Sequence, residues 1–287
     1  MIKQTIENMK HQLLRDKEEL DVKQLFDSII NHFKINLEMI NQYSKFETGE
    51  VYDIKFFERI FVKDIKNLYG NLDKPYLNDY GRVSHNFAPK GVVGVKIAKK
   101  IMLENYLELI KVCLETRNAI IIEQQTNSKL LELLVVLIND IVKQTTDYVC
   151  VELTNVALEN QDIDVLVYVG KKSEFEKLST SAEKIYVGVG EYELFVDEPM
   201  DVNLIEKAKS LGVVVFEKQK GDTLEKLNSL GANYACAIMS PNKSEIKKFI
   251  SQAKASNILV NMLPTLVTKI NLNPEQLVKR KSVVIYQ

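Results

Sequence analysis

Cysteine is scarce in this sequence of 287 residues, which contains only Cys113, Cys150 and Cys236 and no Cys-x-x-Cys pair. An odd number of widely spaced cysteines excludes a disulfide framework and argues against a structural zinc site. It is typical of a reducing compartment, so we expect a cytoplasmic protein. Each cysteine lies in an apolar helical or strand pattern, which predicts a small core residue rather than an exposed nucleophile. We therefore assign no catalytic residue.

An excess of one charge and long apolar runs are missing as well. Lys and Arg together number 38 and Asp and Glu together number 39, so the formal net charge is −1. That balance provides no bulk attraction to nucleic acid or to an anionic membrane. No segment approaches the run of about 18 apolar residues that spans a bilayer, and the charged amino-terminal stretch lacks the apolar segment of a signal peptide. We expect neither a nucleic acid nor a membrane as a partner.

Several motifs of metal binding and catalysis are also absent. The three histidines, His11, His32 and His85, form no HxxH, HxxxH or HExxH pair, which predicts surface histidines and no metal site. No GxSxG sequence supports a hydrolase. Neither GxGxxG nor a GxxxxGK phosphate loop occurs. Any nucleotide site must therefore be built from other residues.

Strands and helices alternate from Gly91 onward, and the strands read as continuous apolar runs such as NAIIIE and DVLVYVG. This pattern predicts an α/β fold, a Rossmann-like and mostly parallel sheet covered by helices on both faces. We expect strands at 91–97, 119–123, 148–153, 165–169, 184–189, 193–196, 213–216, 234–239 and 258–261. We expect helices at 102–114, from about 127 or 128 onward, and at 172–180, 203–211, 222–229 and 243–255. Gly212 and Gly231 are the expected ends of two of these helices.

The flanking regions have different patterns. Residues 1–70 show apolar positions at helical spacing, and residues 71–90 show turns and no helical period, which predicts an extended hairpin with its tip near 79–81. The prediction for domains is therefore helices at 1–70, the hairpin at 71–90, a nucleotide-binding-type domain at 91–212 and a remnant α/β segment with a terminal strand at 213–287. A lone terminal strand needs a partner edge, within the chain or, more favourably, across a homodimer.

Two stretches could face an anion or take part in acid–base chemistry. In VGKKSE, Gly170 ends a predicted strand, and Lys171 and Lys172 begin the next helix, so backbone N–H groups and two cations could hold a phosphate. A tight turn with solvated lysines is the alternative. In FVDEPMD the acidic residues Asp197, Glu198 and Asp201 precede a predicted helix, where capping and the helix dipole explain them without catalysis.

The stretches PKGVVGV and VCLETRNAIII resemble the aldehyde dehydrogenase superfamily. Further matches in DIDVLVYVGKKSEFEKL, KIYVGVGEYELFVDEPMD and LNPEQLVKRKSVVIY are similar to the glutamate-5-semialdehyde dehydrogenases, also called γ-glutamyl phosphate reductases. The resemblance covers most of residues 75–287. It implies a Rossmann-like domain of the aldehyde dehydrogenase type and an oligomerisation hairpin with a terminal strand.

The departures from that family concern its chemistry. The family's nucleophilic cysteine would fall near residues 213–216, where no cysteine is present. A few dozen residues stand where the family has its large catalytic domain. Arg117 replaces a family glycine. Glu123 replaces a basic residue that contacts the cofactor ribose in relatives. A carboxylate there could accept from a ribose hydroxyl and would repel a 2′-phosphate, which favours NAD over NADP.

Two functional hypotheses follow. The first is a degenerate aldehyde dehydrogenase-like protein without dehydrogenase activity, acting as a binding or scaffold protein with a possible protein partner. The second is an NAD(P)-dependent oxidoreductase of the glutamate-5-semialdehyde dehydrogenase type. The cofactor is accordingly none or NAD, with Glu123, Gly170, Lys171 and Lys172 as the candidate binding residues.

Overall fold

The computed structural model describes residues 2–15, 21–62, 76–78, 81–98, 101, 103–124, 127–146, 150–170, 172–187, 192–198, 202–210, 213–229, 235–255, 257–264 and 272–285. The chain forms two compact units. The first comprises Met1–Val169, Lys177–Val187 and Asn271–Gln287, and the second comprises Gly170–Glu176 and Gly188–Ile270. The boundary predicted at residue 212 falls inside the second unit. The predicted helix ends at Gly212 and Gly231 lie outside the described residues.

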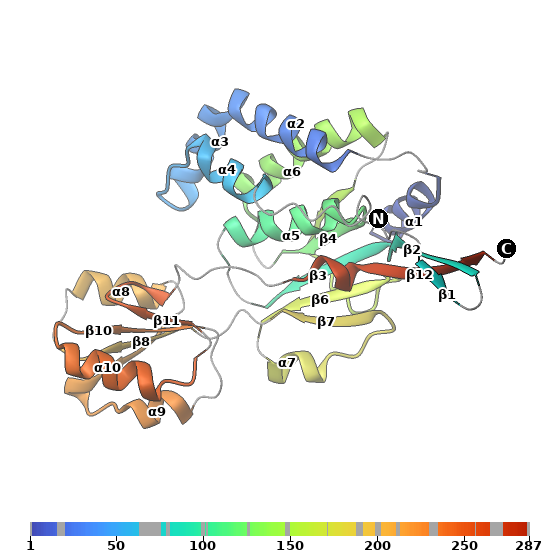
Figure 1. Cartoon of the computed structure of the whole chain (residues 1–287). Coiled ribbons are helices and arrows are strands. Elements are labelled where there is room, and N and C mark those ends of the chain that lie inside the picture. Colours follow the sequence, from blue (N-terminus) through green and yellow to red (C-terminus); the bar gives the residue numbers. More distant parts are fainter. Residues whose placement is uncertain are drawn as a thin grey trace. The chain divides into compact units, whose positions relative to one another are not determined.

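The first unit contains a five-stranded parallel sheet, which confirms the predicted fold class (Figure 1). Its strand order is β5-β4-β3-β6-β7. The chain therefore moves from β3 outward to β5, then returns to the other side of β3 to form β6. The strands are β3 (Val92–Ile97), β4 (Ala119–Glu123), β5 (Val151–Thr154), β6 (Val165–Val169) and β7 (Glu183–Val187). All residues of β6 are buried, as expected for a strand covered on both faces.

Helices cover both faces of this sheet. α1 (Ile2–Arg15) buries Ile6 and Met9 against Val92, Ile121 and Leu166 on one face. On the other face lie α5 (Leu103–Glu115), which contacts β4, and α6 (Lys129–Thr146), which contacts β5. An outer layer of α2 (Val22–Ile35), α3 (Leu37–Glu47) and α4 (Ile54–Phe61) packs on α5 and α6. Burial of these amphipathic faces is the main stabilising term for the helices.

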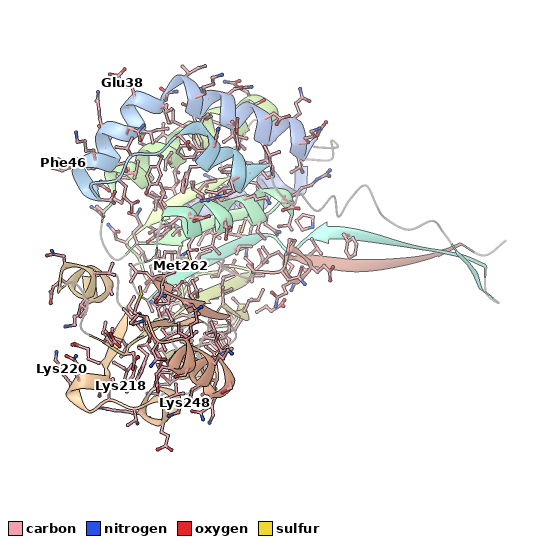
Figure 2. The ribbon with its side chains drawn as sticks, turned by 60° about the vertical axis from the view of Figure 1, so that its left-hand side comes forward. Glu38, Phe46, Lys218, Lys220, Lys248 and Met262 are labelled. Carbon is pink, nitrogen blue, oxygen red and sulfur yellow. The ribbon has the colours of Figure 1, made fainter. Side chains whose placement is uncertain are left out.

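A second, antiparallel sheet in this unit has the order β1-β2-β12. It consists of β1 (Tyr76–Asn78), β2 (Gly81–Pro89) and β12 (Val278–Ile285). β12 pairs with β2 of the same chain from Val278 opposite Pro89 to Ile285 opposite Arg82, and the two strands extend away from the helices of this unit (Figure 2). The terminal strand thus has its partner within the chain, the alternative that the sequence favoured less. Asp79 and Tyr80, at the predicted hairpin tip, lie outside the described residues.

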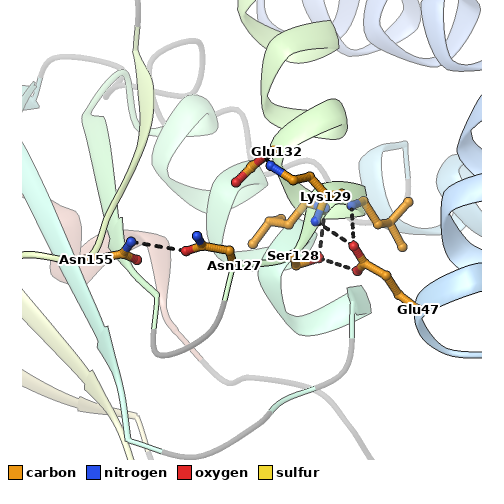
Figure 3. Close-up of polar contacts among 8 residues, drawn as sticks. Glu47, Asn127, Ser128, Lys129, Glu132 and Asn155 are labelled. Atoms are coloured by element: carbon orange, nitrogen blue, oxygen red, sulfur yellow. Dashed lines mark hydrogen bonds and ion pairs between the residues drawn. The ribbon is translucent and has the colours of Figure 1, made fainter.

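The ends of the helices follow local polar chemistry. Asp21 and Asp53 cap α2 and α4 through their side-chain oxygens. The amino terminus of α6 is capped from another helix: Glu47 accepts hydrogen bonds from the Leu130 backbone N–H at 3.1 Å, from the Lys129 backbone N–H and from the Ser128 hydroxyl at 2.7 Å (Figure 3). A carboxylate at this position complements the helix dipole and ties α3 to α6.

A residue in the left-handed backbone conformation follows α5, at the position where the sequence resemblance implies a glycine. Arg117 has φ 56°, and the Asn118 backbone N–H donates to the Cys113 carbonyl at 2.8 Å. This is the hydrogen bond of a Schellman motif, in which the residue after the helix usually is glycine. Arg117 therefore has the backbone conformation that favours glycine.

Two side chains fix the amino edge of the central strand. Asp164 accepts from the Val92 backbone N–H at 2.8 Å, and Asn118 accepts from the Gly91 N–H at 2.8 Å while donating to the Leu277 carbonyl at 2.9 Å. Gly91 has φ 131°, and a Cβ there would lie 2.2 Å from Asp164 Oδ2. The entry to β3 therefore requires glycine for both backbone and steric reasons.

The second unit contains a four-stranded parallel sheet with the order β11-β10-β8-β9. Its elements are β8 (Tyr192–Val196), α8 (Val202–Ser210), β9 (Val214–Glu217), α9 (Leu224–Ser229), β10 (Ala235–Met239), α10 (Lys243–Gln252) and β11 (Asn257–Val260). Phe195, Phe216, Cys236 and Phe249 belong to its core. The strand predicted at 193–196 and those predicted after residue 212 thus form one sheet of their own.

The substitution Gly91→Ala tests the role of Asp164 at the amino end of β3. We expect Gly91→Ala to lower the free energy of unfolding by about 2–4 kcal/mol, because it combines a positive φ with overlap against a carboxylate that holds β3. Gly49→Ala is the matched control: Gly49 has φ 75° but nothing within 4 Å of a built Cβ, so it should cost only about 1 kcal/mol. Equal losses in denaturant unfolding of the two variants would contradict the role assigned to Asp164.

Candidate functional site

The carboxyl edge of the first sheet is the natural place for a site in this unit. All five strands are parallel, so their carboxyl ends meet at one edge. The strand order reverses between β3 and β6, and ligands of open α/β sheets bind in the crevice at such a reversal. Here the Ala98 backbone N–H donates to the Val169 carbonyl at 2.9 Å, which holds the ends of β3 and β6 together.

An ion triad occupies this edge beside β3. Lys96 Nζ lies 2.7 Å from Glu123 Oε1 and 2.8 Å from Glu159 Oε1. The second oxygen of Glu123 accepts from the Leu158 backbone N–H at 3.0 Å. Lys96 and Glu123 are opposite each other in the register of β3 and β4, while Glu159 comes from the segment between β5 and β6. Three residues far apart in the sequence are thus joined at one point.

The ion pairs of the triad keep its groups charged. Burial by itself would lower the pKa of Lys96, but hydrogen bonds to Glu123 and Glu159 raise it above its ordinary value. Burial would likewise raise the pKa of Glu159, but the Lys96 hydrogen bond, a backbone hydrogen bond and the Lys96 charge together lower that pKa. Lys96 is therefore a fixed cation at neutral pH and is no candidate for a general base.

The four predicted cofactor-binding residues do not all lie at the same strand end. Glu123 lies at the end of β4, with both oxygens already accepting hydrogen bonds. Gly170 directly follows β6, which is separated from β4 by β3. Lys171 lies outside the described residues, and Lys172 begins α7 (Lys172–Lys177) with a side chain that is not described. Their role in binding a nucleotide stays a prediction.

Sequence reasoning missed Lys96 and Glu159. Lys96 had a usable signal, because it is a charge inside the otherwise apolar strand VVGVKI and such a charge needs a partner. Glu159 had none, since the segment that carries it shows no period. Only the fold brings it beside β3.

The three cysteines are in no position to act as nucleophiles. Cys113, Cys150 and Cys236 are 0%, 2% and 0% exposed. Burial raises the pKa of Cys113, with a further contribution from Cys150, and burial also raises that of Cys150, both far above the ordinary thiol value. Burial and then the charge of Glu193 raise the pKa of Cys236 to about 12. All three thiols are protonated at neutral pH, as expected for core residues.

The chain has the aldehyde dehydrogenase fold. No family model matches it and no curated protein matches it. Among solved structures, a γ-glutamyl phosphate reductase from Thermotoga maritima matches over 99% of this chain and 98% of that one, at 12% identity and TM-score 0.58. An acetylating aldehyde dehydrogenase from Geobacillus thermoglucosidasius matches over 99% and 96%, at 12% identity and TM-score 0.68. The glyceraldehyde-3-phosphate dehydrogenase GapN from Methanocaldococcus jannaschii, complexed with NADP, matches over 99% and 94%, at 12% identity and TM-score 0.67.

The aldehyde dehydrogenase fold implies a dinucleotide, and the residues described at β4 do not fit its ribose well. In a Rossmann-type domain an acidic side chain at the end of the second strand receives the ribose hydroxyls. Glu123 stands at that strand end, but Lys96 and the Leu158 N–H already hold its two oxygens. A ribose would have to compete with the half-buried ion pair of Lys96 and Glu123.

The second sheet has a polar carboxyl edge of its own. Asp197, which follows β8, accepts from the Lys218 ammonium at 2.5 Å and from the Ser240 hydroxyl at 2.7 Å. Lys218 also lies 3.3 Å from Glu245, and the Ser240 N–H donates to Asn261 at 3.0 Å. Asp197 therefore joins β8 to β9 and β10, whereas the sequence explained it as helix-capping chemistry. Asp201, from the same stretch, lies outside the described residues.

Metal sites and membrane-spanning helices were also sought in the described part of the chain. It contains no group of three or more His, Cys, Asp or Glu side chains placed to hold a metal ion. None of its helices has the length and apolarity needed to cross a membrane.

Asp197 gives a pH-dependent prediction for the second unit. Burial would raise its pKa, but the hydrogen bonds from Lys218 and Ser240 lower it below the ordinary value. Its contribution is therefore present above the unfolded pKa of about 3.9 and is lost as the pH falls toward the folded pKa. We expect Asp197→Asn to lower the melting temperature at pH 7 and to differ little from the wild type below about pH 3.

Glu198→Gln is the control, because Glu198 is exposed and should change the melting temperature little at either pH. If the difference in melting temperature between the wild type and Asp197→Asn is the same at pH 7 and pH 3, the charge of Asp197 is not what stabilises this edge.

Proposed function

We propose that this chain is a degenerate aldehyde dehydrogenase-like protein that lacks dehydrogenase activity and acts as a binding or scaffold protein. The observation that carries the proposal is the burial of all its cysteines. An enzyme that oxidises an aldehyde through a thiol attacks the carbonyl carbon with a thiolate. Cys113, Cys150 and Cys236 have raised pKa values and no access to a substrate carbonyl.

The local structure at the family's nucleophile position supports the same proposal. The resemblance places that position near residues 213–216. Val213 and Phe216 are 4% and 5% exposed, and β9 (Val214–Glu217) runs through this stretch, paired with β8. Val214 is 39% exposed, but valine and phenylalanine side chains provide no nucleophile.

A second candidate function is an NAD(P)-dependent oxidoreductase of the glutamate-5-semialdehyde dehydrogenase type. The reversal of strand order between β3 and β6 favours it, since that is where open α/β sheets bind nucleotides. Gly170 follows β6 at this reversal. The cofactor would then be NAD, and the nucleophile would have to be a residue other than cysteine.

Thiol labelling tests the observation behind the first proposal. With an excess of a thiol reagent at pH 8, we expect no modification of the native protein and three modified cysteines after denaturation, because protonated, buried thiols do not react. Mass spectrometry identifies the sites. The same preparations should show no reduction of NAD or NADP with glutamate 5-semialdehyde or short aldehydes. Rapid native labelling of one cysteine, with aldehyde-dependent NADH formation that the label abolishes, would refute the proposal.

Nucleotide binding separates the two candidates. A ligand present at 100 times its Kd stabilises the native state by about 2.7 kcal/mol, which a thermal-shift measurement detects. We expect no rise in melting temperature with NAD, NADP or ATP at millimolar concentration. A saturable rise with NAD that Glu123→Gln removes would instead support the oxidoreductase, and Glu7→Gln, on the exposed face of α1, controls for a general effect of the charge.

A further inference from the structure

We draw no further inference here: the strongest candidate, the open cleft between α2 and α4 that is lined by Asp27, Ile30, Lys55, Glu58 and Arg59, carries charges of both signs, and nothing in the described structure shows what fills it.

Discussion

The position of β3 is the constraint on which the rest of the first unit depends. It is the central strand of the parallel sheet, with β4 and β6 on its two sides. Its amino edge is fixed by the Asp164 carboxylate and the Asn118 amide, and its carboxyl edge by the ion triad of Lys96. A strand held at both ends sets the register of its neighbours, and through them the places of the helices that pack on the sheet.

Polar groups at the carboxyl edges of both sheets pair largely with one another. The carboxyl edge of a parallel sheet normally offers unpaired polar groups to a ligand. Here Lys96 pairs with Glu123 and Glu159, and Glu123 uses both oxygens within the protein. In the second unit Asp197, Lys218 and Ser240 satisfy one another in a similar way. Polar groups that stabilise these edges by pairing are less available to bind and polarise a substrate.

The amino-terminal helices form an aromatic layer of their own. α2 and α4 bury aromatic side chains such as Phe33 and Phe57, whose ring centroids are 4.9 Å apart. Glu47 fixes the end of α3 to the start of α6. These contacts hold the amino-terminal helices on α5 and α6.

The amino-acid sequence by itself determined the α/β class, most of the strands and helices, and the burial of the cysteines. These are properties of local apolar period, which one segment expresses without reference to another. It also left the terminal strand with two possible partners, because the pattern of a strand says nothing about which edge it meets.

Tertiary structure alone decided which residues meet. Glu159 joins Lys96, Ser240 joins Asp197, and β12 pairs with β2 of the same chain. Contacts of this kind depend on strand order and on the path of the chain between strands, and those follow from packing the whole core rather than from any local pattern.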